Sequence, residues 1–336
     1  MISGRELRVA VVGVGHLGQH HARVFSELEG VRLAGVVDTD ASHREAVALR
    51  LGCEAWARYE ELPGRVDAAS VAVPTKFHFE VASYLLEHGV PVLVEKPMTS
   101  TLEEGRSLKT LAESSGVLLQ VGHIERFNPV FQAIRDFQIR PRFIEAHRLA
   151  PFSFRSTDVG VVMDLMIHDI DLVLEMVDSP VVKVDAVGGA PLSAQEDIAN
   201  ARLEFASGCI ANITASRMSL KKLRRLRVFA EDSFISLDFD KKYGFVAKKA
   251  ADFEAKMESL RGMDAATMGP MAAVAFQGLI DQRELELDTA EPLKQELLSF
   301  VAAVRDGREA VVPPSHGLRA MELACRIQDE IRKRGW

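Results

Sequence analysis

The most restrictive feature of the sequence is the segment Gly13-Val14-Gly15-His16-Leu17-Gly18, which stands between a strand pattern and a helix pattern. The β-branched run Leu7–Val12 precedes it, and a helical pattern continues to about Leu28. In a G-x-G-x-x-G turn of this kind, the first glycine permits the tight turn and the second lets a pyrophosphate approach the backbone. The third allows the helix to pack closely on the strand, and the helix N-terminus faces the anion. We therefore expect dinucleotide contacts from Gly13, Gly15, His16, Leu17 and Gly18.

The next strand pattern, Val31–Val37, ends at Asp38, which stands 20 residues after Gly18. An acidic residue at this distance binds the ribose hydroxyls of the adenosine. Its charge repels a 2′-phosphate, so the sequence predicts NAD as the cofactor. NADP remains the less favoured alternative because Arg44 lies nearby.

Strand and helix patterns alternate from residue 7 to about residue 121. This alternation predicts an α/β fold with a doubly wound parallel sheet and right-handed crossovers. Ligands bind such sheets at the carboxyl ends of the strands. Beyond the glycine turn and Asp38, those ends carry Pro74, Thr75, Glu95, Lys96 and His123.

The pattern changes after about residue 125, and from Val181 to about Leu287 it consists mostly of short strands broken by turns. This predicts a second, α+β domain with a mostly antiparallel open sheet. We expect a dinucleotide-binding domain over residues 1–123 and a substrate and oligomerisation domain over residues 124–315. A C-terminal helix over residues 316–336 is expected to pack back on the first domain. Residues 250–280 have no clear period.

One predicted helix, residues 160–178, is apolar almost all the way round and suits a buried position. At ~100° per residue its polar side chains share a narrow arc, with Asp169 alone pointing elsewhere. The stripe either faces solvent or contributes to a site. We expect its first part to be an acid/base pair and its last part to reach water. The stripe consists of Asp164, His168, Asp171, Glu175 and Asp178.

Lys96 follows a central strand and precedes Pro97, which keeps the backbone of Lys96 extended. A lysine at a strand end is usually a solvated charge. At the ligand edge of the sheet, however, its ammonium could stabilise an alkoxide as hydride leaves a hydroxyl. His168 suits the role of general base near neutral pH, with Asp164 supporting it.

Composition excludes several functions. The formal net charge of −7 argues against a nucleic-acid surface. No window approaches the ~20 apolar residues of a membrane span, and the N-terminus lacks the apolar core of a signal peptide. The three cysteines, Cys53, Cys209 and Cys325, are far apart, which fits a reducing cytoplasm. No metal site is expected, because Asp164 and His168 lack a third ligand.

Taken together, the glycine turn, Pro74-Thr75 with His78, Glu95-Lys96-Pro97 and Asp164-x-x-x-His168 resemble the Gfo/Idh/MocA oxidoreductases. The resemblance spans nearly the whole chain. It implies a Rossmann domain joined to an α/β domain whose open sheet commonly mediates oligomerisation, here a homodimer or homotetramer. It also implies a catalytic trio of Lys96, Asp164 and His168, cofactor contacts from His78 and Glu95, and a Lys96–Pro97 peptide that is often cis.

A narrower resemblance lies in Gly122–Pro129, Met166–Asp171 and Val228–Glu231. It is similar to the branch of the family that oxidises the 3-hydroxyl of UDP-N-acetylglucosamine to a 3-keto sugar. In that branch an aminotransferase then installs an amino group used in variant lipid A. A nucleotide-sugar substrate is therefore expected. Two alternatives remain: a dehydrogenase of free sugars, polyols or inositols, and an NAD-binding regulator without chemistry.

Further contacts with the substrate are expected from Glu125 and Arg126, since guanidinium suits phosphate. A structural salt bridge of Arg126 is nearly as well supported. The basic run 221–227 could bind a diphosphate, but alternation along a strand explains most of it. His20 and His21 are interpreted as ordinary helix residues.

Overall fold

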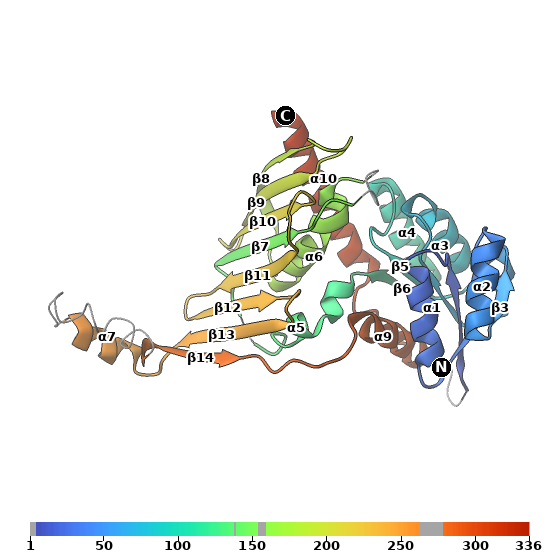
Figure 1. The fold of residues 1–336 in the computed structure, drawn as a ribbon, viewed down its shortest axis with the longest axis horizontal. Coiled ribbons are helices and arrows are strands. Elements are labelled where there is room, and N and C mark those ends of the chain that lie inside the picture. Colours follow the sequence, from blue (N-terminus) through green and yellow to red (C-terminus); the bar gives the residue numbers. More distant parts are fainter. Residues whose placement is uncertain (1–4, 138, 154–158, 262–277, 336) are drawn as a thin grey trace. The chain divides into compact units, whose positions relative to one another are not determined.

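The computed structural model describes residues 5–137, 139–153, 159–261 and 278–335. The chain divides into two compact units, each built around its own sheet (Figure 1). The first unit comprises Met1–Asn128 and Ala290–Arg326, and the second comprises Pro129–Thr289 and Ile327–Trp336.

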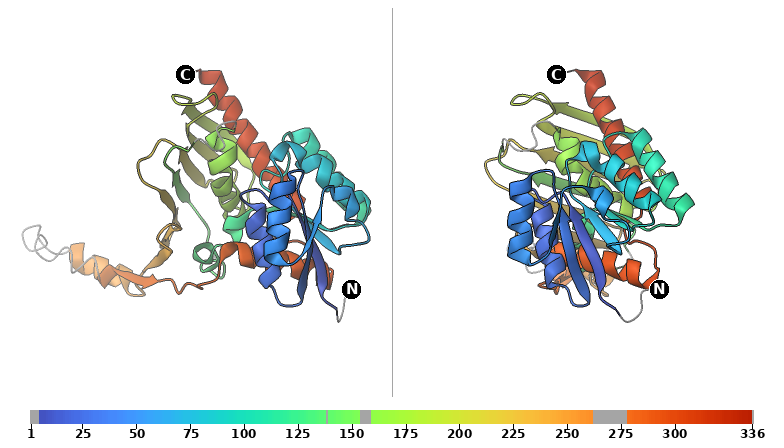
Figure 2. Two further views of the ribbon diagram at one scale, coloured as in Figure 1. Left: turned by 45° about the vertical axis from the view of Figure 1, so that its right-hand side comes forward. Right: turned by 90° about the vertical axis from the view of Figure 1, so that its right-hand side faces the viewer.

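The first unit contains a six-stranded sheet in which every described pairing is parallel. Helices lie on both faces of this sheet (Figure 2), which confirms the predicted doubly wound arrangement. The sheet order is β3 (Glu54–Trp56), β2 (Val31–Val37), β1 (Leu7–Val12), β4 (Ala68–Val71), β5 (Val92–Glu95) and β6 (Leu119–Gly122). The helices that connect the strands are α1 (Gly18–Glu27), α2 (Ala41–Leu51), α3 (His78–Glu87) and α4 (Leu102–Ser115).

The strand order reverses between β1 and β4, and ligands bind open α/β sheets at the carboxyl edge beside such a reversal. The carboxyl edge therefore carries the glycine turn, Asp38 and Lys96 together.

Local sequence signals set where the helices begin. Asp40 caps α2 by accepting a hydrogen bond from the His43 amide, and Thr101 and Glu104 form a capping box at the start of α4.

Helix α9 (Pro292–Asp306) belongs to the first unit, although the expected second domain extends to residue 315. The difference has a packing cause. Leu297 and Phe300 of α9 are fully buried in the cluster that also holds Leu7 of β1 and Phe25 of α1. Arg305 at the end of α9 donates a hydrogen bond to the Gly30 carbonyl over 2.8 Å. The chain thus returns to complete the core of the first unit.

The last helix, α10 (Pro314–Arg334), is assigned to the first unit up to Arg326 and to the second from Ile327 onward. In the first unit, Gly317 lies so close to Val121 that a Cβ on it would sit 2.8 Å from the valine side chain. Helix α10 is long enough to be considered as a membrane span, but it is rich in charged residues. In the part of the chain that the structure describes, no helix is long and apolar enough to cross a bilayer.

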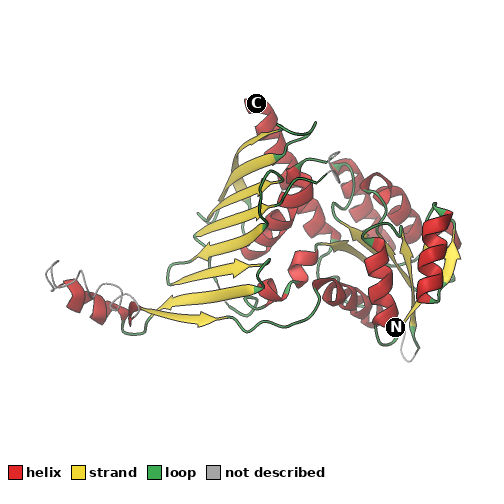
Figure 3. Cartoon of the chain, viewed as in Figure 1, coloured by secondary structure: helices red, strands yellow, loops and turns green. Residues whose placement is uncertain are grey.

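The second unit contains an eight-stranded sheet (Figure 3). Only β7 and β10 pair in parallel among the described pairings, so the predicted mostly antiparallel sheet is confirmed. Gly208, with a positive φ, turns the chain between β9 and β10. The sheet order is β14 (Ile280–Glu284), β13 (Tyr243–Lys249), β12 (Ser233–Asp238), β11 (Leu223–Phe229), β7 (Phe143–Leu149), β10 (Ile210–Ser216), β9 (Ile198–Phe205) and β8 (Val181–Gly189).

Helix α6 (Ile167–Met176) covers one face of this sheet by packing on β7 and β10. Ile144, Ala146 and Arg148 of β7 are buried beneath it. The alternate residues of β7 point to the opposite face. There Phe143 stands opposite Phe229 of β11 and both side chains are half-buried, so this second face is the open one.

The predicted helix 160–178 is not a regular α-helix along its whole length. A π-helical turn covers Val162–Met166, and α6 follows it. The Glu196 carboxylate accepts a hydrogen bond from the Val162 amide over 3.2 Å and one from the Gln328 side chain over 3.1 Å. The wider π turn, braced by Glu196, changes the angular spacing between Asp164 and His168 that a regular helix would give.

A 3-10 turn at Ile124–Phe127 and the short α5 (Pro129–Gln132) follow β6. Residues 250–280, which have no clear period in the sequence, contain α7 (Phe253–Arg261), and residues 262–277 lie outside the described residues.

Candidate active site

The glycine turn has the geometry that its spacing predicts. Gly13 adopts a φ of +86°, and a Cβ on it would lie 2.8 Å from the Ala72 carbonyl oxygen. A Cβ on Gly18 would lie 1.7 Å from the Gly13 oxygen, so only glycine fits at the start of α1. Gly15 has no atom within 4 Å of its Cβ position and is exposed. The turn is thus tightly packed beneath and open above, as a pyrophosphate requires.

Asp38 is anchored at the end of β2. One carboxylate oxygen accepts a hydrogen bond from the Val14 amide and the other accepts one from the Asp40 amide, both over 2.9 Å. These bonds fix a negative charge beside the glycine turn, where ribose hydroxyls can donate to it. The Arg44 guanidinium donates to the Asp38 carbonyl over 3.3 Å. That contact holds Arg44 on the main chain of Asp38.

A cavity of about 360 Å³ opens beside this turn. It is bounded by Val14, Gly15 and His16 on one side and by residues of α2, among them His43 and Arg50, on the other. Exposed backbone, an anchored carboxylate and a helix N-terminus together fit a bound NAD.

Lys96 stands directly after β5, and its peptide bond to Pro97 is cis. The Lys96 side chain is half-buried. Its main-chain amide donates to the Glu95 carboxylate over 3.2 Å, and Glu95 itself is only 9% exposed. Gly122 of β6 lies against Glu95, since a Cβ there would be 3.1 Å from the carboxylate. The strand end thus presents a lysine backed by a buried acid.

His78 and His123, both expected to touch the cofactor, are buried at 1% exposure each. The two ring nitrogens of His78 contact the Pro97 and Val73 carbonyl oxygens, each over 2.9 Å. Burial lowers the pKa of His78 and outweighs the hydrogen bonds that raise it. Its observed contacts therefore brace the main chain around Lys96, and its direct contact with the cofactor stays a prediction.

Thr75 opens a 3-10 turn, Thr75–Phe77, and Pro74 before it is exposed at the same edge of the sheet. His16 and Leu17 are exposed beside the glycine turn. These four residues remain accessible to a ligand.

Glu125 and Arg126 are buried in the 3-10 turn that follows β6, at 5% and 4% exposure. Glu125 accepts a hydrogen bond from the Asn128 side chain over 2.9 Å. The expected contacts of Glu125 and Arg126 with substrate stay predictions. Within the basic run, Arg227 pairs with Glu145 at 2.8 Å and Arg225 pairs with Asp238 at 3.4 Å, whereas Lys221 and Lys222 are exposed.

The acidic stripe of the second unit separates into three parts. Asp164 in the π turn and His168 at the start of α6 are half-buried. Asp171 is 1% exposed. Glu175 is exposed near the end of α6, and Asp178 is exposed just after it, as expected for side chains that reach water.

Asp169 points away from the stripe, as predicted, and forms a buried ion pair. Two nitrogens of the Arg148 guanidinium donate to its two carboxylate oxygens, each over 2.9 Å. Both side chains are 4% exposed. This bidentate pair ties α6 to β7 directly beside His168.

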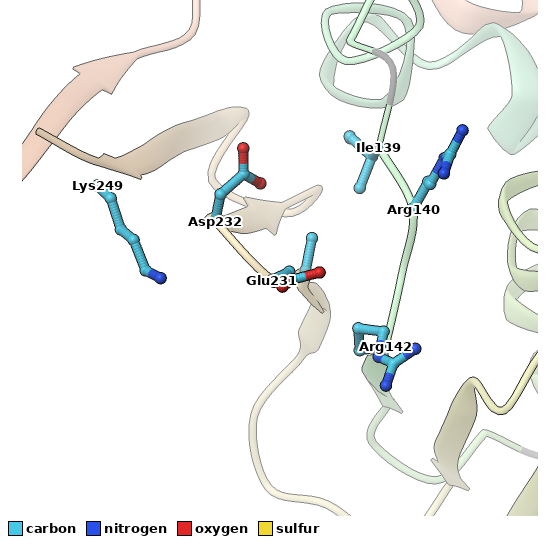
Figure 4. Close-up of a pocket in the computed structure, with 7 residues that line it drawn as sticks. Ile139, Arg140, Arg142, Glu231, Asp232 and Lys249 are labelled. Carbon is cyan, nitrogen blue, oxygen red and sulfur yellow. The ribbon is translucent and has the colours of Figure 1, made fainter. Parts of the chain in front are cut away.

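A cavity of about 730 Å³ lies elsewhere in the second unit (Figure 4). It is lined by Ile139, Arg140, Arg142, Ala230, Glu231, Asp232 and Lys249. Arg142 precedes β7 by one residue, whereas Arg148 lies six positions along, roughly 20 Å away at the rise of a strand. No candidate catalytic residue lines this cavity, so its size is no reason to place the chemistry there. Among the described residues, no group of three or more His, Cys, Asp or Glu side chains could hold a metal.

The interpretation of His21 as an ordinary helix residue is wrong. His21 is 1% exposed, and its Nε2 lies 3.0 Å from the Glu95 carboxylate. Its Nδ1 lies 2.8 Å from the hydroxyl of Ser70 in β4. The signal was present in the sequence, because His21 falls on the same helix face as Gly18, Ala22 and Phe25, all of them buried.

Comparison with known proteins agrees with this geometry. Residues 7–123 match the oxidoreductase family with an NAD-binding Rossmann fold, and residues 133–236 match the GFO/IDH/MocA C-terminal domain. The sequence is 42% identical over 234 residues to UDP-N-acetylglucosamine 3-dehydrogenase of Acidithiobacillus ferrooxidans, covering 69% of this chain and 74% of that protein. It is 30% identical to scyllo-inositol 2-dehydrogenase (NAD(+)) of Bacillus subtilis, covering 64% and 68% respectively.

The solved structure of the Acidithiobacillus ferrooxidans enzyme superposes with a TM-score of 0.86 at 32% identity, covering 98% of this chain and 99% of that one. The similarity therefore extends over both units. This chain belongs to the Gfo/Idh/MocA family of oxidoreductases, with an NAD-binding Rossmann domain at its N-terminus.

Proposed function

We propose that the protein oxidises the 3-hydroxyl of UDP-N-acetylglucosamine to the 3-keto sugar with NAD. The observation that carries this proposal is the 42% identity to an enzyme named for that reaction, across 74% of the length of that enzyme. The near-complete structural similarity at 32% identity supports it. The anchored Asp38 carboxylate supports NAD over NADP, because it would lie against a 2′-phosphate.

Lys96, Asp164 and His168 are assigned the catalytic roles. NAD, when bound, accepts the hydride from the carbon that bears the hydroxyl. His168 takes the hydroxyl proton, Asp164 orients the imidazole, and the Lys96 ammonium stabilises the charge that develops on oxygen. Lys96 belongs to the first unit and the other two belong to the second. The domain roles follow: cofactor binding by the first unit and substrate binding by the second.

The decisive experiment mixes purified enzyme, NAD and UDP-N-acetylglucosamine and follows the absorbance of reduced nicotinamide. An aminotransferase specific for the 3-keto sugar is added to remove the product, so that an unfavourable oxidation equilibrium does not hide turnover. Formation of the 3-amino sugar, identified by mass spectrometry, supports the proposal. No turnover in the coupled assay contradicts the substrate assignment.

The competing candidate is a free inositol, favoured by the 30% identity to the inositol enzyme of Bacillus subtilis. The same assay with scyllo-inositol, myo-inositol and free N-acetylglucosamine distinguishes the two. A ratio of kcat/KM above about 100 in favour of the nucleotide sugar, worth about 2.7 kcal/mol, identifies the diphosphate and uridine as recognised groups.

We also propose that copies of the chain associate through the open face of the eight-stranded sheet. The four phenylalanines of this face form a continuous ladder, with ring centroids 5.7, 4.7 and 5.6 Å apart. Half-exposed aromatic rows of this kind are typical of interface cores. The ladder consists of Phe143, Phe229, Phe234 and Phe245.

Replacing Phe229 tests this association. Phe229→Glu puts a charge at the centre of the ladder and is expected to lower the molar mass measured by light scattering from that of a dimer or tetramer to that of a monomer. Leu220→Glu, at an exposed residue of the loop before β11, is the matched control. If the wild type is a monomer, or if the Phe229 variant keeps its assembly, the open face is not the interface. As part of the proposed oxidation of UDP-N-acetylglucosamine, we also propose that the protein acts in the cytoplasm and that an aminotransferase uses its product.

A further inference from the structure

A buried chain of hydrogen bonds runs beneath the lysine of the first unit. It begins at the Ser70 hydroxyl of β4, passes through the imidazole of His21 and reaches the Glu95 carboxylate at the end of β5. The distances along it are 2.8 and 3.0 Å. All three side chains are buried, so none of these contacts is exchanged readily with water.

The two oxygens of Glu95 serve different neighbours. Oε1 faces His21 Nε2, and Oε2 accepts the main-chain N–H of Lys96 over 3.2 Å. The position of the carboxylate is therefore set by His21 on one side and sets the Lys96 backbone on the other. Ser70 fixes the rotation of the imidazole ring, because a histidine with both nitrogens engaged cannot flip without losing both bonds.

We propose that His21 is a positioning residue for Lys96, acting through the Glu95 carboxylate that lies between them. This inference rests on the proposed role of Lys96 in catalysis. The main-chain amide of His21 donates to the Leu17 carbonyl of the glycine turn over 3.2 Å, whereas its imidazole is turned to Ser70 and Glu95. Its effect is to hold the carboxylate so that the Lys96 backbone keeps one position.

Electrostatics agree with this arrangement. Burial of Glu95 raises its pKa, but the hydrogen bond from His21 and the charges of His21 and Lys96 outweigh burial, and the pKa lies below its usual value. The titratable groups that face Glu95 are His21 from α1, His78 from α3, and Lys96 beside it in the chain. Without His21, the desolvated carboxyl loses its strongest compensating partner and its pKa must rise.

The test compares His21→Phe with His21→Gln. Phenylalanine keeps the volume and removes both hydrogen bonds, whereas the glutamine amide can still donate to Glu95 from about the position of Nε2. We expect His21→Phe to lower kcat with UDP-N-acetylglucosamine by at least ~10-fold and to leave the Kd of NAD within about threefold. His21→Gln should recover most of the lost kcat. His88→Phe, at an exposed histidine of the same unit, is the control.

The pH profile separates positioning from mere loss of stability. In His21→Phe the acidic limb of kcat should move toward neutral pH as Glu95 takes up a proton. Glu95→Gln in that background should remove this displacement and leave the limb that His168 sets as general base. Unchanged kcat and an unchanged profile in His21→Phe would overturn the proposal. A loss of NAD affinity equal to the loss of kcat would also overturn it, since that indicates a role in cofactor binding.

Two further measurements keep the inference testable if the substrate or the variant fails. Infrared spectroscopy can detect a protonated carboxyl that appears in His21→Phe near neutral pH and disappears when Glu95→Gln is added. This measurement needs no turnover. If wild-type enzyme shows no reaction with UDP-N-acetylglucosamine, the proposed function fails, but the infrared result still tests whether His21 keeps Glu95 ionised.

If His21→Phe does not fold, Ser70→Ala is the alternative variant. It removes only the hydrogen bond that orients the imidazole ring and should lower kcat by a smaller factor than His21→Phe. An unchanged kcat in Ser70→Ala contradicts the proposal.

Discussion

Lys96 is the residue on which the proposed chemistry depends most directly. Lys96→Met keeps a linear side chain of similar length and removes the charge that would stabilise the developing alkoxide. We expect kcat to fall by about 10²–10⁴-fold, the usual size for loss of such a group. Calorimetric titration should show NAD binding within about threefold of wild type. His168→Gln should behave alike, and full activity of both variants would contradict the mechanism.

Asp38 carries the expected preference for NAD. Asp38→Ser removes the charge that opposes a 2′-phosphate and also removes a carboxylate that holds the Val14 amide. We expect KM for NAD to rise by about tenfold, roughly the value of one charge-assisted hydrogen bond, while KM for NADP falls. Steady-state rates with each cofactor give the ratio.

Asp40→Asn is the matched control for Asp38→Ser. It removes a neighbouring charge while asparagine still caps α2. If Asp38→Ser and Asp40→Asn lose discrimination against NADP to the same extent, the total negative charge of this region, and not Asp38 itself, sets the preference for NAD.

Among individual residues, those whose position follows directly from the order of strands along the chain could be predicted from the sequence. The glycines and Asp38 are recognisable because a parallel sheet brings successive strand ends to one edge. His21 is not recognisable in this way. Its partners, Ser70 and Glu95, lie on two other strands, and only the packing of α1 over the sheet brings the imidazole to them. For Arg126, which is 4% exposed, the expected contact with substrate stays a prediction.

The Arg148–Asp169 pair is the contact that holds α6 on β7, one residue from His168. Removing one partner of a buried bidentate pair leaves an uncompensated charge. We expect Arg148→Met or Asp169→Leu to lower the free energy of unfolding by about 3–5 kcal/mol. The double variant should lose much less than the sum of the two, and urea denaturation of all four proteins measures this coupling.

A loss of less than about 1 kcal/mol in either single variant would place the pair among ordinary surface salt bridges. Activity of the double variant gives a second test. The pair lies in the first turn of α6, beside His168. A double variant that is stable but has a low kcat would show that the Arg148–Asp169 pair also orients the His168 side chain.

At the scale of elements, the sequence predicted strand–helix alternation in the first part of the chain and short strands broken by turns in the second, because alternation and turn residues are local signals. The π turn at Val162–Met166 could not be predicted in the same way. Hydrophobic periodicity is nearly the same for an α-helix and for an α-helix with one widened turn. The turn is braced by Glu196, which lies more than 30 residues later in the chain.

For the whole molecule, composition and strand alternation were enough to predict two sheets of different kinds, one parallel and one mostly antiparallel. The assignment of α9 to the first unit was not predictable from its position after the second sheet. Its apolar stripe resembles that of any amphipathic helix, and the partner it finds, the cluster around Phe25, is formed by residues at the other end of the chain.

The acid stability of the first unit should depend on Asp67, the residue just before β4. Asp67 pairs with Arg5 at 2.8 Å and with Arg8 at 2.9 Å, and its own side chain is 6% exposed. Burial raises the pKa of Asp67, but the hydrogen bonds from Arg8 and Arg5 outweigh burial and lower it to about 2 from 3.8. A folded-state pKa below the unfolded value stabilises the fold above about pH 4, and this stabilisation is lost as the pH falls toward 2.

The size of this contribution follows from the shift, reduced because both arginines are partly exposed to solvent. We expect about 1–2 kcal/mol, so that Asp67→Asn lowers the free energy of unfolding by that amount at pH 7 and by almost nothing near pH 2. Trp56 of β3 is buried in the same unit and reports its unfolding by fluorescence once Trp336→Phe removes the second tryptophan. Asp306→Asn, at the exposed end of α9, is the control for loss of a surface charge. An equal loss in Asp67→Asn at both pH values would show that the three-residue cluster stabilises the unit by packing, and that protonation of Asp67 has no part in its acid unfolding.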